Sequence, residues 1–303
     1  MKLRRVLNDD GLQVQVLQPD GSWAEAPEAA TPPVGATFTG DWEVAFAQRH
    51  WDVSGQCLPF QPVSFRDFML YEKHAVDAAR GLVGRFMPAA APVARAFEKV
   101  SGRTFPAFRP KPLFYRQPIY YMSNHLSFVP SGTPMEFPSY TAALDYELEL
   151  GFVLKSPLFN ATPQEALEAI GAFVVVNDFS ARDVQRAEMV TGLGPQKAKH
   201  FASSMSAVAV TADEILPRVE SLTGSVSING TTVGTVSSAG PQWSIGEVLA
   251  HASRDERLYP GELFATGTLP GGSGMETGHW LRPGDRLVLT IDQIGEVSHQ
   301  IAA

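Results

Sequence analysis

Glycine and proline interrupt this chain at about one position in six, with 26 glycines and 23 prolines among 303 residues. Both residues favour turns and disfavour the interior of regular elements, so long uninterrupted helices are not expected. The stretches between the turn signals either alternate apolar and polar residues or form short apolar runs, which is typical of strands. We therefore predict an α+β protein in which strands dominate.

The pattern along the chain predicts two domains. Alternation over residues 12–18, followed by turn residues, indicates a small N-terminal β-containing module over 1–62. Within it, residues 25–37 are interpreted as a loop or linker and 42–56 as a short helix. Residues 63–303 are expected to form one larger, mixed domain.

Several local signals predict individual elements of the larger domain. Apolar residues at helical spacing indicate a single helix over Phe65–Phe86. Helix starts are predicted where a serine or threonine precedes a helical pattern, and a hairpin is predicted where Asn-Gly separates two alternating segments. These signals lie at Thr162 with Glu165, at Ser180, at Ser244 with Glu247, and at Asn229-Gly230. Strands are expected over Leu144–Leu154, Phe173–Val176 and, as the last one, Leu287–Ile291.

Composition excludes several classes of function. A formal net charge of −8 argues against a nucleic-acid-binding surface or an anionic-membrane surface. The single cysteine, Cys57, excludes an intrachain disulfide and a thiolate-rich metal cage. No apolar run approaches the roughly 20 residues that span a bilayer, and no apolar segment follows the basic start, so a cytoplasmic protein is expected.

Acidic residues give the first indication of a site. Glu147 and Glu149 are two apart in a predicted strand, so both side chains point to one face. They are either the wet face of an edge strand or two ligands of a cation. Asp178 directly follows a buried apolar run, and Asp67 is a further candidate. Such an all-oxygen set suits Mg²⁺, Ca²⁺ or Mn²⁺ better than zinc. Asp145 is either another ligand or a residue at the rim.

Basic and polar residues follow Asp178. Arg182 and Gln185 are three apart, so they share one side of the predicted helix. Lys199 stands next to glycine and proline and is expected on a loop. Near a metal site these groups would hold an anionic substrate or a developing oxyanion, and otherwise they are ordinary solvated charges. His74, flanked by charged residues on a predicted helix, is by itself typical of a surface histidine.

Ordered segments from about Ser64 to the C-terminus resemble the fumarylacetoacetate hydrolase family. The sequence LDYELELGFV is similar to the glutamate pair of the family, and VVNDFSARDVQ is similar to its aspartate-and-helix segment. KHF resembles the lysine loop, and FATGTLPGG resembles the threonine loop. The resemblance implies a C-terminal catalytic domain of the mixed β-sandwich or β-roll type. It also implies a divalent-metal-dependent enzyme, usually a homodimer, of the kind found in aromatic catabolism.

The resemblance also implies a role for each site residue. The metal ligands would be Asp67, Glu147, Glu149 and Asp178, holding Mg²⁺ or else Ca²⁺ or Mn²⁺. The segment RDFMLYEKH is similar to that of the larger, hydrolytic members, in which a histidine follows the aspartate ligand by seven positions. That makes His74 the general base, paired with Glu276. The catalytic set then includes Lys199, Arg182 and Gln185, and the substrate-binding set is Tyr121, Thr268 and Met69.

The implied activity is hydrolysis of a carbon–carbon bond in a 1,3-dicarbonyl, either an acylpyruvate or a fumarylacetoacetate-like β-diketo acid. Water activated by His74 attacks, and a metal-stabilised enolate leaves. Decarboxylation, isomerisation by tautomerisation, or hydration of a 2-oxo acid on the same metal core are alternatives, as is a non-catalytic metal-binding protein. Met69 replaces a tyrosine of the hydrolases, Ala202-Ser203 replaces a glycine–threonine pair, and no arginine matches the one that grips the far end of a dicarboxylate.

Overall fold

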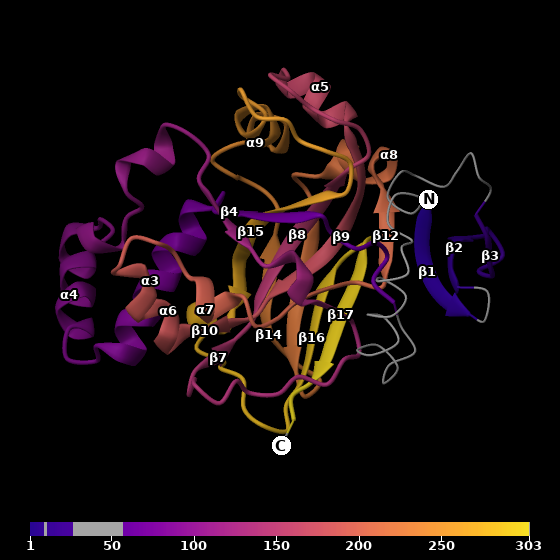
Figure 1. Ribbon diagram of the computed structural model, residues 1–303. Coiled ribbons are helices and arrows are strands. Elements are labelled where there is room, and N and C mark those ends of the chain that lie inside the picture. The colour runs from indigo at the N-terminus through magenta and orange to yellow at the C-terminus, as the bar shows by residue number, and fades with distance from the viewer. Residues whose placement is uncertain (9–10, 27–56, 303) are drawn as a thin grey trace.

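A large sheet organises the molecule (Figure 1), and the computed structural model describes residues 1–8, 11–26 and 57–302. The sheet consists of β1 (Lys2–Asn8), β2 (Gly11–Leu17), β3 (Trp23–Glu25), β4 (Ser64–Phe68), β5 (Tyr120–Ser123), β6 (Phe128–Pro130), β8 (Glu147–Leu154), β9 (Ile170–Asp178), β11 (Ser203–Met205), β12 (Val208–Thr211) and β15 (Glu262–Ser273). Its main path has the order β3-β2-β1-β12-β9-β8-β15-β4-β5, and β11 joins β9 to β6 beside this path. The strands that carry acidic residues therefore lie at the centre of the sheet and close to one another.

A second sheet packs on the first. It has the order β14-β13-β16-β17 and consists of β13 (Thr223–Ile228), β14 (Thr231–Ser237), β16 (Arg286–Ile291) and β17 (Gly295–Gln300). Its strands contact β8, β9 and β15, and apolar side chains such as Phe152, Val175 and Leu289 fill the core between the two sheets. Phe60 and Val174 belong to another core on the opposite face of the large sheet. The central strands are therefore buried on both faces, in a sandwich-like α+β fold.

The helices lie around the sheets. They are α3 (Glu72–Phe86), α4 (Ala91–Ser101), α5 (Pro163–Glu168), α6 (Arg182–Met189), α7 (Gln196–Lys199), α8 (Ala212–Ile215), α9 (Ile245–Ala252) and α10 (Gly274–Thr277). In Figure 1, α3, α4, α6 and α7 gather on one side of the sheet, whereas α5 and α9 pack together at its upper end. No helix within the described parts of the chain is long and apolar enough to cross a membrane.

The strongest local signals are confirmed. Thr162 and Ser244 each cap a helix through a complete capping box, in which the third helical residue is a glutamate. Asn229 and Gly230 join β13 to β14, and both have positive φ, 54° and 79°. This is the backbone that a two-residue hairpin turn requires, and it is why Asn-Gly predicts the hairpin.

The prediction of one helix over Phe65–Phe86 is wrong in its first part. Ser64–Phe68 is the strand β4, which pairs with β15 in parallel and with β5 antiparallel, and the helix begins only at Glu72. Phe65, Arg66 and Asp67 are all buried, so residues on both faces of β4 lie away from solvent. A strand buried on both faces loses the polar alternation that distinguishes it from a helix.

Two other predictions are corrected. Ser180 belongs to β10 (Ser180–Ala181), which pairs with β7 (Leu144–Asp145), and the hydroxyl of Ser180 donates to the Asp178 carbonyl and does not cap α6. The strand predicted over Leu287–Ile291 is present as β16, but β17 follows it.

The N-terminal region is described only in part. The predicted helix over 42–56 lies outside the described residues, as does most of the predicted linker. β1 pairs with β12, so the first strands extend the large sheet. A separate module over 1–62 stays a prediction.

Candidate active site and metal centre

Four carboxylates meet where the central strands of the large sheet end. Asp67 lies on β4, Glu147 and Glu149 on β8, and Asp178 is the last residue of β9. Each offers one oxygen, and these oxygens all lie within 4.8 Å of one another. All four residues are buried, with exposed fractions of 5% or less. The interpretation of Glu147 and Glu149 as the wet face of an edge strand is therefore wrong.

The donor set fits a hard divalent cation. Both carboxylate oxygens of Glu149 and Oδ1 of Asp67 are buried, and none of the amide, hydroxyl or ammonium groups of the described residues donates a hydrogen bond to them. Burial raises the pKa of Asp67 well above its usual range, and the Asp178 carboxylate adds to this. Burial likewise raises the pKa of Glu149, together with the charge of Asp67. A cation bound among these oxygens would offset the cost of burying carboxylates without donors and the repulsion between their charges. An all-carboxylate set suits Mg²⁺, Ca²⁺ or Mn²⁺.

Lys199 lies next to the carboxylates. Its ammonium donates to Oδ2 of Asp178 over 2.5 Å and also to Oε2 of Glu147. Burial would lower the pKa of Lys199, but Asp178 and Glu147 outweigh it and hold the ammonium protonated. The Tyr121 hydroxyl donates to Oδ2 of Asp178 over 2.6 Å and the Ser203 hydroxyl to Oδ1 over 3.1 Å. Lys199 is thus a buried cation at the end of α7, and the expected loop position is corrected.

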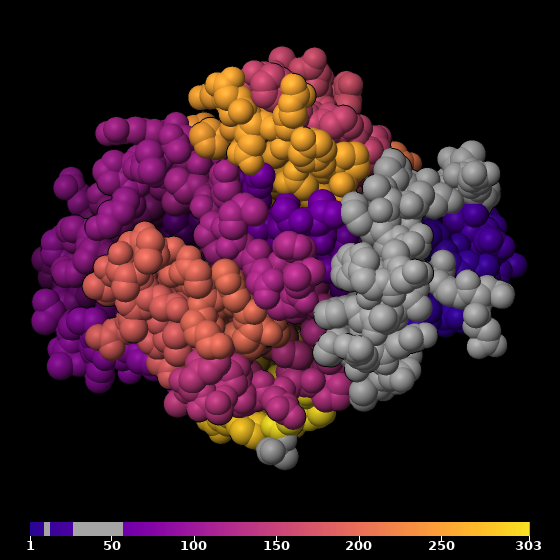
Figure 2. Space-filling model, viewed as in Figure 1, coloured from indigo at the N-terminus to yellow at the C-terminus, as the bar shows by residue number. Residues whose placement is uncertain are grey.

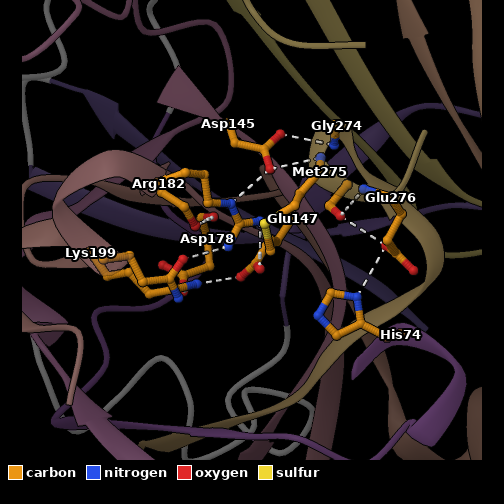
Figure 3. A network of polar contacts seen from close by, with 12 residues as sticks. His74, Asp145, Glu147, Asp178, Arg182, Lys199, Gly274, Met275 and Glu276 are labelled. Atoms are coloured by element: carbon orange, nitrogen blue, oxygen red, sulfur yellow. Dashed lines mark hydrogen bonds and ion pairs between the residues drawn. The ribbon is translucent and has the colours of Figure 1, made fainter. Parts of the chain in front are cut away.

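Arg182 holds Glu147 in position and does not itself line the cavity. Its Nη2 donates to Oε1 of Glu147 over 2.8 Å, and its Nε donates to Oδ2 of Asp145 over 2.8 Å (Figure 3). Its Nη1 donates to Oε1 of Gln185 over 2.9 Å. Asp145 also accepts the first two backbone amides of α10, over 2.8 and 3.0 Å. We call the four carboxylates of Asp67, Glu147, Glu149 and Asp178 the metal cluster. Asp145 is neither a member of this cluster nor a rim residue, but the fully buried partner of Arg182.

His74 and Glu276 face each other although they are far apart in the sequence. Nδ1 of His74 lies 3.0 Å from Oε2 of Glu276 (Figure 3). The side chains are 11% and 3% exposed, so His74 is not a surface histidine. Glu276 is itself held, because it accepts hydrogen bonds from the Gly271 amide over 3.0 Å and from the Ser273 hydroxyl over 2.8 Å.

A cavity of about 270 Å³ opens on this group of residues. Of the residues predicted to form the site, all except Arg182, Asp178 and Glu276 line it. α6 and α7 supply one wall, and Figure 2 shows this salmon-coloured segment at the surface beside the purple segment of α3 and α4. Thr268 pairs with Glu149 across β15 and β8. Gly267, with φ of 74°, leaves no room for a Cβ, which would lie 2.2 Å from the Phe68 carbonyl oxygen.

Some site residues have no signal of their own in the sequence. Ser203 departs from the family pattern, yet its hydroxyl binds Asp178. Ile119 and Met189 line the cavity, but in a sequence a single apolar residue that lines a cavity cannot be told from one in the core. The role of Asp145 depends on Arg182, which is 37 positions away. In the sequence, only the two-residue spacing to Glu147 marks Asp145, and this spacing does not predict that it binds Arg182.

Comparison with known proteins relates the chain to one enzyme family. The family model described as "Fumarylacetoacetate (FAA) hydrolase C-terminal" matches residues 89–302. The chain is 32% identical over 162 residues to the oxaloacetate tautomerase YisK of Bacillus subtilis, covering 53% of each chain. It is 28% identical over 155 residues to the mitochondrial oxaloacetate tautomerase FAHD1 of Homo sapiens, covering 51% of this chain and 70% of that protein. The chain thus spans about half the length of the first of these relatives.

Solved structures share the fold. The fumarylacetoacetate hydrolase of Exiguobacterium antarcticum superposes with a TM-score of 0.68 at 20% identity, covering 100% of this chain and 99% of that one. A 5-carboxymethyl-2-hydroxymuconate delta-isomerase from Mycobacterium smegmatis gives 0.68 at 20%, covering 100% and 98%. Asp67 and His74 precede the segment that the family model matches, so their placement rests on geometry. The family model covers more than half of the residues, and the chain therefore belongs to the fumarylacetoacetate hydrolase family.

Proposed function

We propose that this protein is a divalent-metal-dependent hydrolase that cleaves the carbon–carbon bond of a 1,3-dicarbonyl, an acylpyruvate or a related β-diketo acid. The observation that carries the proposal is the contact of 3.0 Å between Nδ1 of His74 and Oε2 of Glu276, at a cavity that also contains carboxylates of the metal cluster. A carboxylate at Nδ1 favours the tautomer with the proton on that nitrogen. Nε2 is then the basic atom, as a water-activating histidine requires.

The residues of the chain divide the work of hydrolysis among them. Nε2 of His74 takes a proton from water, whose oxygen forms a bond to the distal carbonyl carbon of the substrate. The Lys199 ammonium and the Nε2 amide of Gln185 stabilise the charge on that carbonyl oxygen, since Oε1 of Gln185 is already bound by Arg182. The carbon–carbon bond then breaks, and its electron pair leaves with the pyruvyl part, whose carbon is protonated. Asp67, Glu147, Glu149 and Asp178 would hold a divalent ion, which would supply positive charge to polarise the ketone and stabilise the enolate.

Tautomerisation is the second candidate, and the names of the two curated relatives favour it. A base and an acid beside a polarised carbonyl are enough to interconvert keto and enol forms, and no water is consumed. Decarboxylation or hydration of a 2-oxo acid would use the same metal core. A non-catalytic metal-binding protein would not require the buried contact between His74 and Glu276.

One experiment separates these activities. Purified protein is incubated with Mg²⁺, and in parallel with EDTA, against a panel of acylpyruvates and against oxaloacetate. Hydrolysis consumes the enol absorbance of an acylpyruvate and releases one pyruvate for each molecule consumed. A change of absorbance without pyruvate indicates tautomerisation, and carbon dioxide indicates decarboxylation. If neither pyruvate nor the other half of the substrate appears from any acylpyruvate, the hydrolase proposal is wrong.

A further inference from the structure

Three elements lead away from the metal cluster, and each ends in an apolar side chain that lines the cavity. On β4 and the residue after it, the chain runs from Asp67 to Met69, and on β5 and the residue before it, from Tyr121 to Ile119. Each step of two extended residues covers about 7 Å. On α6 the chain runs from Arg182 to Met189, about 10 Å along a helix.

Met69, Ile119 and Met189 line the cavity at the ends of these three segments. The Met69 amide donates to the Ile119 carbonyl over 3.2 Å, so these two residues are neighbours. Met189 is four positions after Gln185 and therefore lies on the same side of α6, and both residues line the cavity. Phe68 and Tyr120 add to the wall, with ring centroids 4.8 Å apart.

The cavity lacks a countercharge for a second carboxylate. Among its lining residues there is one lysine, Lys199, and no arginine in the parts of the chain that the structure describes. The ammonium of Lys199 binds Glu147 and Asp178, so this positive charge lies at the carboxylate cluster and not beside Met69, Ile119 and Met189. A carboxylate at the far end of a substrate would therefore lie against methionine and isoleucine side chains without a cation to pair with it, which is unfavourable.

We infer that Met69, Ile119 and Met189 select substrates whose distal acyl group is uncharged and apolar, and reject those that carry a second carboxylate there. The inference rests on the proposed function and narrows its substrate class. A 2,4-dioxo acid with an alkyl or aryl end fits the wall, whereas a fumaryl-type chain with a terminal carboxylate does not. Apolar atoms gain from burial along this wall, and none of its side chains is charged.

Paired substrates of equal length test the inference. With Mg²⁺ present, 2,4-dioxooctanoate should have a kcat/KM about tenfold higher than 2,4-dioxooctanedioate, because its alkyl end buries apolar surface against the wall and the carboxylate finds no cation there. Calorimetric binding of 2-oxooctanoate and 2-oxooctanedioate, which cannot be hydrolysed as β-diketones, should show the same order of affinity. Equal affinities, or tighter binding of the dicarboxylate, would overturn the inference.

Variants locate the effect on the wall. Met189→Arg should shift the ratio at least about tenfold toward the dicarboxylate, and Met189→Leu should keep it. Met189 is 54% exposed, so an arginine there can keep its charge in water. Met87→Arg is the matched control, since Met87 follows α3, is 43% exposed and does not line the cavity. If both arginine variants shift the ratio equally, the wall does not select.

The binding and turnover measurements can reject the hydrolase proposal and the selectivity inference independently of each other. If no 2,4-dioxo acid is hydrolysed but 2-oxooctanoate still binds more tightly than 2-oxooctanedioate, the hydrolase proposal is wrong and the selecting wall stands. If both dioxo acids are hydrolysed at equal kcat/KM, the hydrolase proposal stands and the selecting wall is wrong.

Discussion

Arg182 and Glu147 are joined by a hydrogen bond of 2.8 Å between two side chains that are 1% and 6% exposed. On its other side, the same guanidinium binds Asp145. The charges of Arg182 and Lys199 outweigh the effect of burial on Glu147 and hold the pKa of its carboxyl below its usual range. Of the metal cluster, Glu147 is thus held as a carboxylate by neighbouring cations, whereas the pKa values of Asp67 and Glu149 are raised.

Replacing Asp145 should destabilise the fold. Asp145→Asn leaves the buried guanidinium of Arg182 with one carboxylate fewer, and removing one partner of a buried pair costs about 3 kcal/mol. Denaturant unfolding in EDTA measures the loss. Asp20→Asn, on an exposed turn, is the control and should change the free energy of unfolding by less than about 0.5 kcal/mol. An equal effect of both variants would contradict the role assigned to Asp145.

Removing the base or its partner should slow catalysis without removing the metal. His74→Gln and Glu276→Gln should each lower kcat for an acylpyruvate by about 10²- to 10⁴-fold, because water is no longer activated. Mn²⁺ affinity, measured by calorimetry, should change little. His251→Gln alters a partly exposed histidine outside the cavity and serves as the control. If Glu276→Gln keeps the wild-type kcat, Glu276 does not orient the base.

The metal should stabilise the wild-type protein and not a ligand variant. At an ion concentration 100 times its Kd, binding to the native state adds about 2.7 kcal/mol to the free energy of unfolding. Glu149→Gln should lose most of this gain. Without the ion, the same variant should be at least as stable as the wild type, because the buried carboxylate of Glu149 has no donor among the described residues.

Thermal unfolding with Mg²⁺ and with EDTA gives both comparisons for Glu149→Gln. Glu168→Gln, on the exposed side of α5, is the control and should respond to Mg²⁺ as the wild type does. A full stabilising response of Glu149→Gln to the ion would exclude Glu149 as a ligand.

His299 should make stability depend on pH. Its Nδ1 lies 2.7 Å from the Thr133 carbonyl oxygen and its Nε2 lies 2.8 Å from the Ser204 hydroxyl, and burial lowers the pKa of His299 to about 4. The unfolded chain takes up this proton near pH 6.5, so the free energy of unfolding falls as the pH drops from about 6.5 to 4. The full loss from this group is about 3 kcal/mol.

A substitution isolates that contribution. In EDTA, His299→Gln should lose less stability than the wild type between pH 7 and pH 4.5. The exposed His279, changed to glutamine, should leave the wild-type pH dependence intact. If His299→Gln and the wild type lose the same free energy over this range, the histidine is not buried in its neutral form.

The parts of the site that lie close together in the sequence could be predicted from it. Strand parity alone places Glu147 and Glu149 on one face, and the structure puts both in the cluster. The pairing of His74 with Glu276 follows only from the family resemblance, because no local spacing connects residues 202 positions apart. Such a contact depends on the order of strands in the sheet, which local periodicity does not predict.

The misread segments share a physical cause. The chain around Phe65 has apolar residues at positions that suit a helix, but hydrogen bonds from two neighbouring strands make it β4. Ser180 has the side chain of a helix cap, but pairing with Asp145 draws it into β10. In both cases tertiary pairing overrides a local preference worth about 1 kcal/mol or less.

The place of β15 between β8 and β4 has a consequence for biosynthesis. During translation, Asp67 leaves the ribosome almost two hundred residues before the strand that must separate it from Glu149. Until β15 is made, β4 can pair only with β5, so Asp67 cannot join the three carboxylates on β8 and β9. The complete set of four carboxylates that could hold a cation therefore exists only in a chain that has been synthesised past β15.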